Sequence, residues 1–281
     1  MAVSPDIRKR LLYAKYLLSR AKKDQNDRNE LAVAACLLLM HDATELLMLA
    51  GTDHLGIGSN WKFMEFWEKV KQSGHKEPGH KTPMSQLNDM RVSLKHKGIL
   101  PRPQSVRDLF PRVEIFCEEV SKDLLGLDFG DLSLADLVAD DEVRNALRDA
   151  TQALSSGDKN QAFINVRIAF DELHRLISQD VPLIDEPRRL RSSKSEIPSD
   201  AMDDLYTLYE GVKECVETLN VSMLGIDPIR YTFFINNTPH ISWTVSGLHQ
   251  TTLSRDYNNM PDEVFQTCFE FVVDVALNAS R

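Results

Sequence analysis

Residues 88–98 read NDMRVSLKHKG, and residues 227–237 read DPIRYTFFINN. When Arg91 of the first stretch is superimposed on Arg230 of the second, His96 falls opposite Ile235. The first stretch therefore has an Arg-x4-His motif, and the second keeps only the arginine. An internal repeat decides the fold before any single element does. We expect two related halves with unequal roles.

Outward from these stretches, helical periodicity dominates the sequence in both directions. The pair Ser4-Pro5 is a typical helix start, and Gly98 is a typical helix end. The segment 27–49 is apolar on almost all sides, so it should be the buried central helix of its bundle, ending at Gly51. The first half predicts helices at 5–23, 27–49, 59–72, 83–97 and 105–125.

The order of helices restarts after a joint rich in Gly and Asp near residue 130. Residues 240–245, HISWTV, alternate at period two and predict at most a short β-hairpin near 240–250. Residues 181–199 contain three prolines and predict an exposed connection. Further helices are predicted at 133–154, 159–178, 200–219 and 262–276. The sequence thus predicts an all-α fold of two tandem helical bundles, 1–126 and 127–281.

Charge is unevenly distributed along the chain. The net charge is −9, which argues against general affinity for nucleic acid over the whole surface. Residues 61–112 nevertheless carry 11 Lys or Arg against 5 Asp or Glu. This basic segment indicates either a phosphate-bearing partner or a solvated basic face that binds nothing.

The remaining composition is that of an ordinary soluble protein, and we expect a cytoplasmic one with no membrane partner. The apolar run 31–40 is too short to span a membrane. The four cysteines form no CxxC pair and predict buried, reduced thiols. His75 and His80 share a loop without carboxylates or thiols at ligand spacing, so we expect no metal and no cofactor.

Two pairs match an Arg-x4–6-His spacing, and their contexts differ. Arg167 and His174 lie along an amphipathic pattern beside acidic residues, which is typical of a satisfied helix face. Arg91 and His96 lie in the last turns of a helix inside the basic segment. There, a histidine can move a proton at a ribose 2′-hydroxyl, and a guanidinium can stabilise the phosphate charge of a transition state.

With these residues the chain resembles the HEPN superfamily, helical bundles of which many members are metal-independent ribonucleases marked by Arg-x4–6-His. The resemblance covers the helical layout of residues 5–125, more weakly that of 133–281, and the positions Arg91 and His96. It implies an endoribonuclease that leaves a 2′,3′-cyclic phosphate, with His96 as acid/base and Arg91 as phosphate stabiliser. It also implies a defence or toxin–antitoxin role, a homodimer, and an antitoxin or regulatory protein as partner.

Residues five apart on a continuous helix point about 140° away from each other. Either the helix breaks near Lys95, or a second motif completes the site. That motif comes from the other half, which supplies Arg230, or from a second chain, which we prefer because it supplies a second histidine. Residues expected to bind RNA are Lys95, Lys97, Arg102 and Lys81.

Supporting residues are expected on the central helix. His41 and Glu45 share one face there, with Asp42 adjacent. They predict either groups that orient His96 or Arg91, or an ordinary buried cluster whose members hydrogen-bond to each other.

A rival hypothesis is a non-catalytic helical adaptor that binds RNA, a nucleotide or a protein through HEPN-like bundles. It is favoured by Val92, where the family often has a polar residue, by Ile235 in the second stretch, and by the overall acidity.

Overall fold

A computed structural model describes residues 3–25, 29–179, 184, 199–243, 249–253 and 255–279. The chain divides into two compact units, Met1–Leu134 and Ala135–Arg281. The fold is all-α, as predicted. Most of the predicted connection at 181–199 lies outside the described residues.

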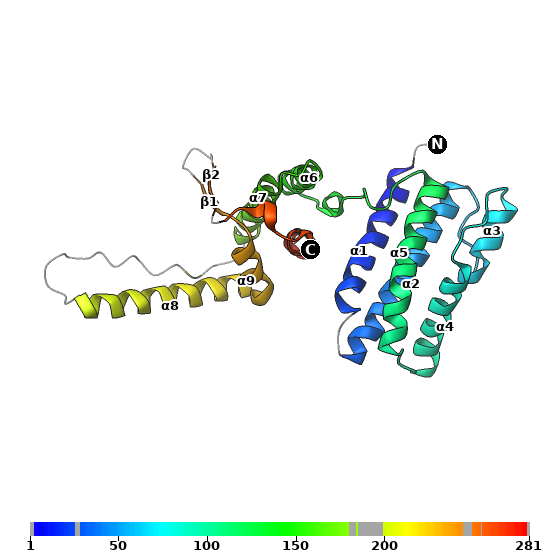
Figure 1. Cartoon of the computed structure of the whole chain (residues 1–281), viewed down its shortest axis with the longest axis horizontal. Coiled ribbons are helices and arrows are strands. Elements are labelled where there is room, and N and C mark those ends of the chain that lie inside the picture. The colour runs from blue at the N-terminus through cyan, green and yellow to red at the C-terminus, as the bar shows by residue number, and fades with distance from the viewer. Residues whose placement is uncertain are drawn as a thin grey trace. The chain divides into compact units, whose positions relative to one another are not determined.

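The first unit is a helical bundle built around one apolar helix (Figure 1). The central helix, α2, contacts α1, α5 and α4. Its elements are α1 (Pro5–Asp24), α2 (Glu30–His54), the 3-10 turn η1 (Phe63–Glu65), α3 (Phe66–Gln72), α4 (Lys81–Lys97) and α5 (Pro103–Leu125).

Helix α2 is longer than predicted because it continues through Gly51 to His54. A Cβ at position 51 would lie 3.0 Å from Cδ1 of Leu124, so this glycine allows α5 to approach α2 and does not end the helix. Among the described residues, α2 is the one helix long and apolar enough to cross a membrane, and 56% of that apolar window is buried inside the protein.

The segment after α5 returns to α1, and the first unit extends to Leu134. The ammonium group of Lys15 on α1 donates hydrogen bonds to the carbonyls of Phe129 (3.1 Å), Gly130 (2.6 Å) and Leu132 (2.6 Å). Burial lowers the pKa of Lys15. The three carbonyls compensate for the lost hydration of its charge.

The second unit packs α7 against α6 and α10, with α9 beside α10. The predicted hairpin is present as an antiparallel pair, with His240 opposite Thr252. The elements are η2 (Leu134–Leu137), α6 (Asp141–Ser155), α7 (Lys159–Ser178), α8 (Ser199–Met223), α9 (Pro228–Asn237), β1 (His240–Trp243), β2 (His249–Thr252), η3 (Tyr257–Asn259) and α10 (Asp262–Ala279).

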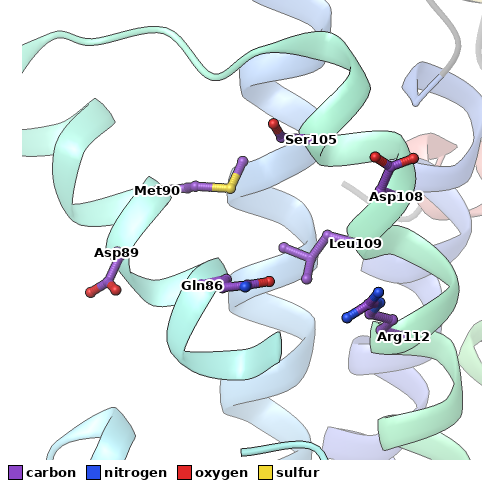
Figure 2. Close-up of a pocket in the computed structure, with 7 residues that line it drawn as sticks. All are labelled: Gln86, Asp89, Met90, Ser105, Asp108, Leu109 and Arg112. Carbon is purple, nitrogen blue, oxygen red and sulfur yellow. The ribbon is translucent and has the colours of Figure 1, made fainter. Parts of the chain in front are cut away.

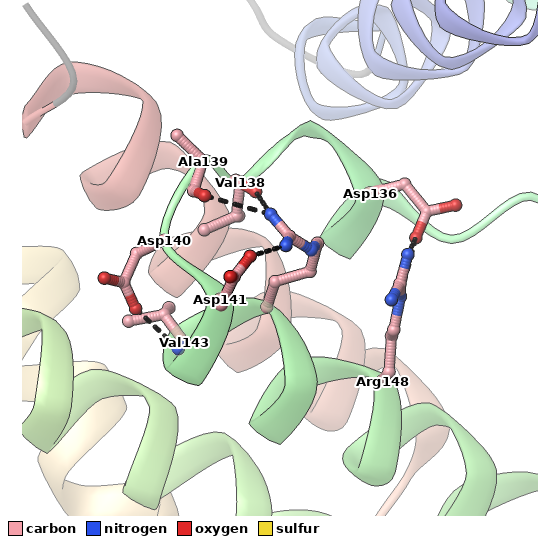
Figure 3. A network of polar contacts seen from close by, with 8 residues as sticks. Asp136, Val138, Ala139, Asp140, Asp141, Val143 and Arg148 are labelled. Carbon is pink, nitrogen blue, oxygen red and sulfur yellow. Dashed lines mark hydrogen bonds and ion pairs between the residues drawn. The ribbon is translucent and has the colours of Figure 1, made fainter. Parts of the chain in front are cut away.

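Polar contacts fix the entry to this unit (Figure 3). Asp140 caps α6 by accepting a hydrogen bond from the backbone N–H of Val143 (2.9 Å). Arg144 donates to the carbonyls of Val138 (2.7 Å) and Ala139 (3.0 Å). It also pairs with Asp141. These bonds satisfy the backbone carbonyls just before α6 and fix the direction in which the chain enters that helix.

The predicted internal repeat is not shown by this arrangement. Arg91 lies in the second half of α4, whereas Arg230 lies in the first turn of α9. The two arginines therefore occupy different places in their helices, although their flanking sequences can be superimposed.

Candidate functional site

Helix α4 is continuous through Lys97, so of the two alternatives the one that required a break near Lys95 is wrong. Gly98 ends the helix in the left-handed region, at φ 65°. Its N–H bonds to the carbonyl of Leu94 (3.1 Å), and the N–H of Ile99 bonds to that of Ser93 (3.3 Å). Because the helix is regular, Arg91 and His96 point about 140° apart and do not converge within one chain.

Arg91 instead shares a helix face with Asn88 and Lys95, three residues before it and four after it. This face is turned toward α2, because Arg91 and Asn88 both act electrostatically on His41. The structure therefore brings Arg91 together with the predicted supporting residues of α2. We call His41, Asp42, Glu45, Asn88 and Arg91 the α2–α4 seam.

His41 is the most buried member of the seam, with 2% of its surface exposed. Its ring stacks on Phe63 at 4.4 Å and 22°. Nδ1 lies 3.7 Å from Oδ1 of Asp42 and 3.9 Å from Oε2 of Glu45. Burial lowers the pKa of His41, and the charge of Arg91 adds to the effect, while the surrounding polar groups oppose it. The imidazole is therefore neutral at pH 7.

Three buried side-chain nitrogens in the described part of the chain have no hydrogen-bond partner, and all three belong to this seam: Nδ1 and Nε2 of His41, and Nε of Arg91. Asn88 approaches His41 closely enough to favour its protonation, but no bond of normal geometry forms. A buried polar atom without a partner is costly and needs an explanation.

The seam also contains a set of metal-type donors that sequence spacing did not indicate as ligands. One atom each of His41, Asp42 and Glu45 lie within 4.8 Å of one another. The charges of Glu45 and Asp42 favour positive charge at His41, whereas the charge of Arg91 opposes it, and the effect of Glu45 is larger than that of Arg91.

The exposed end of α4 presents cations that have no counter-charge. Within the described ranges, the side chains of Lys95 and Lys97 at this end, of the neighbouring His96, and of Arg102 at the N-cap of α5 form no hydrogen bond or ion pair, and all four are exposed. Cations are stabilised at a helix C-terminus by the helix dipole. They remain available to a phosphate, and Lys95 lies one turn beyond Arg91 on the same face.

Two predicted residues do not join this group. Lys81 stands at the opposite end of α4, about 21 Å along the helix axis from Lys95, and pairs with Glu77 at 3.5 Å. Arg230 belongs to the second unit, where its Nη2 lies 2.8 Å from Oδ2 of the buried Asp274.

The second Arg–His pair is structural, as its sequence context indicated. Arg167 donates to Asp171 at 2.9 Å, on the same helix. Burial lowers the pKa of His174, and nearby carboxylates oppose that shift. Beside it, Tyr231 donates a hydrogen bond to Glu217 at 2.8 Å. The charges here are arranged in pairs.

A pocket of about 470 Å³ lies between α4 and α5, away from the seam (Figure 2). Asp89 in its wall is two residues from Arg91 and therefore about 160° round the helix. The pocket is lined by the carboxylates of Asp89 and Asp108, whose negative charge disfavours binding of a phosphate. Arg112 lines the same pocket. The pocket does not extend the α2–α4 seam.

Sequence reasoning placed His41 correctly in the interior but missed its lack of partners. The one sequence signal for this site was that His41 interrupts the apolar segment 27–49. It was also wrong about Cys215, which is exposed, whereas Cys36, Cys117 and Cys268 are buried as predicted. Comparison with known proteins finds no matching family model, curated protein or solved structure.

Proposed function

We propose that the first unit binds the phosphate backbone of RNA along α4 and that two copies together cleave it without a metal. The observation that carries the proposal is that Arg91, in the second half of α4, has a buried Nε without an acceptor. The open end of this helix carries further cations without counter-charges. A phosphate is the common ligand that would accept hydrogen bonds from Arg91 and lie within reach of Lys95.

In this mechanism Arg91 stabilises negative charge on the phosphate, and Lys95 and Lys97 hold the backbone. His96 removes the 2′-hydroxyl proton and returns a proton to the departing 5′-oxygen, which leaves a 2′,3′-cyclic phosphate. Because Arg91 and His96 of one chain diverge, His96 acts beside Arg91 of a second copy. His41 does not touch RNA. It is a positioning residue whose neutral ring packs beside Arg91.

The experiment incubates the full chain with total RNA in the presence of a chelator. The parent should cut RNA, and His96→Ala should lower the rate by about 100-fold or more while leaving the helical circular dichroism unchanged. His75→Ala, which removes another exposed histidine of the same unit, is the matched control and should cut normally. Cleavage by His96→Ala at the parental rate rejects the catalytic role.

A second candidate, a non-catalytic RNA-binding adaptor, is favoured by the divergence of Arg91 and His96 along one continuous helix. It predicts binding without cleavage. Replacing Lys95 and Lys97 together by Glu should weaken RNA binding about 10-fold or more at 0.1 M salt. The control is Lys9→Glu with Lys22→Glu on α1, which changes net charge equally. Equal loss in both double variants would indicate only general charge repulsion.

A further inference from the structure

Helix α8 has little support within the described part of the second unit. It runs from Ser199 to Met223, and its one substantial helical neighbour is α9. The support lies at its C-terminal end, where Val221 is buried and Glu217 accepts the hydrogen bond of Tyr231. The rest of α8 extends away from the other helices of the unit (Figure 1). An isolated helix of this length is only marginally stable in water.

Helix α8 exposes large apolar side chains at regular spacing along its length. Intervals of three, four and seven residues separate them, and Cys215 occupies the intervening position of a heptad pattern. At about 100° per residue, they form one stripe about 80° wide. The stripe contains Leu205 (37% exposed), Leu208 (67%), Val212 (43%), Leu219 (52%) and Met223 (47%).

Most charges of α8 lie away from this stripe. Glu210, Glu214 and Glu217 project from the opposite side of the helix. Asp204, which directly precedes Leu205, is the exception and flanks the seam, whereas the further flanking positions are uncharged at Tyr209, Gly211, Val216 and Thr218. A partner helix with basic flanks would therefore find a single acid beside the seam. A parallel second α8 would place Asp204 opposite the uncharged Tyr209, and Gly211 would allow close approach.

We propose that α8 is a dimerisation helix, whose apolar stripe packs against the same stripe of a second copy of this chain. The contact is symmetric, so each copy covers the surface that the other leaves open. The proposal does not depend on RNA binding. It supplies the second copy that cleavage requires, because joining two chains raises the effective concentration of one α4 near the other.

The test measures the molar mass of the full chain by light scattering from about 1 to about 100 micromolar. The parent, of 31.9 kDa per chain, should approach twice that mass as concentration rises. Leu208→Asp should remain monomeric at every concentration. The control is Tyr206→Asp, which adds the same charge at nearly equal exposure (64% against 67%) but outside the stripe. It should dimerise like the parent.

A second measurement keeps the test valid if Leu208→Asp perturbs α8 itself. Cys215 is the exposed cysteine of the four, so maleimide labels it selectively. Its labelling should be slower in the dimeric parent than in the same protein diluted to monomer. A parent that stays monomeric overturns the proposal, as does a dimer that survives Leu208→Asp or labels Cys215 at the monomer rate. The cleavage assay is read separately: RNA cut by the parent in chelator but not by His96→Ala supports the proposed function, whichever surface joins the two copies.

Discussion

Arg91 in the first unit and Arg230 in the second both place a guanidinium at a helix face turned toward the interior, but only Arg230 has a carboxylate partner. Arg230 lies 2.8 Å from Asp274 and over the ring of Phe271. Arg91 has a buried Nε without an acceptor, next to a histidine in the same condition. Arg230 therefore has its acceptor inside the protein, whereas the buried Nε of Arg91 calls for an explanation, and the proposed RNA phosphate supplies one.

The largest effect that would test this comparison is on stability. Arg230→Met removes the ion-pair partner of the buried Asp274 and should lower the free energy of unfolding by about 2 kcal/mol. This is less than for a fully buried pair, because the side chain of Arg230 is 35% exposed. Urea unfolding followed by circular dichroism measures the loss. An unchanged midpoint would show that Asp274 does not depend on Arg230, and the contrast between the units would fail.

A second, smaller effect is the pH dependence of stability. The pKa of His41 and that of His174 are both lowered, chiefly by burial. Unfolded histidine binds a proton near pH 6.5, whereas these two resist protonation when folded. Their contribution is therefore present above about pH 6.5. As pH falls below that value it is lost, at no more than about 1.4 kcal/mol per pH unit for each group.

The unfolding free energy of the parent, measured at pH 7, 6 and 5, should therefore decrease as the pH falls. His41→Gln should make that decrease shallower, and so should His174→Gln, because each removes one proton-binding site of the unfolded chain. The exposed His75→Gln is the control for loss of an imidazole. If His41→Gln retained the full parental slope, His41 would not be a neutral buried group.

Local patterns explain why most helices could be predicted. The end of α4 follows from Gly98, whose left-handed backbone conformation favours glycine, and the hairpin follows from alternation at 240–245. Gly51 misled the prediction for a tertiary reason, since the close approach of Leu124 from a distant helix is invisible in the local sequence. A glycine that ends a helix, such as Gly98, and one that allows a neighbouring helix to approach, such as Gly51, look the same in the local sequence.

The candidate site could be predicted in part. Arg91 was identified from its spacing to His96, and His41 and Glu45 were identified as polar residues on one face of an apolar helix. Which of them meet depends on the continuity and rotation of α4, and a continuous helix separates His96 from Arg91. The missing hydrogen bonds of His41 depend on how two helices face each other. Spacing within one helix carries no information on that.

The smallest effect, and the sharpest test of the comparison, is the stability change in Arg91→Met. Methionine keeps the apolar stem that packs between the helices and removes a buried donor that has no acceptor. The free energy of unfolding should change by less than about 1 kcal/mol, whereas Arg230→Met loses more. Without the charge of Arg91, the pKa of His41 should also rise toward its ordinary value, which would flatten the pH dependence.

Arg167→Met is the matched control for this last prediction, because it removes an arginine that has a partner, Asp171, at 2.9 Å. It should be more destabilising than Arg91→Met although both replacements are identical. If Arg91→Met were as costly as Arg230→Met, Arg91 would be a structural cation like those of the second unit. If it were neutral for stability but weakened RNA binding, its charge would be needed by the ligand and not by the fold.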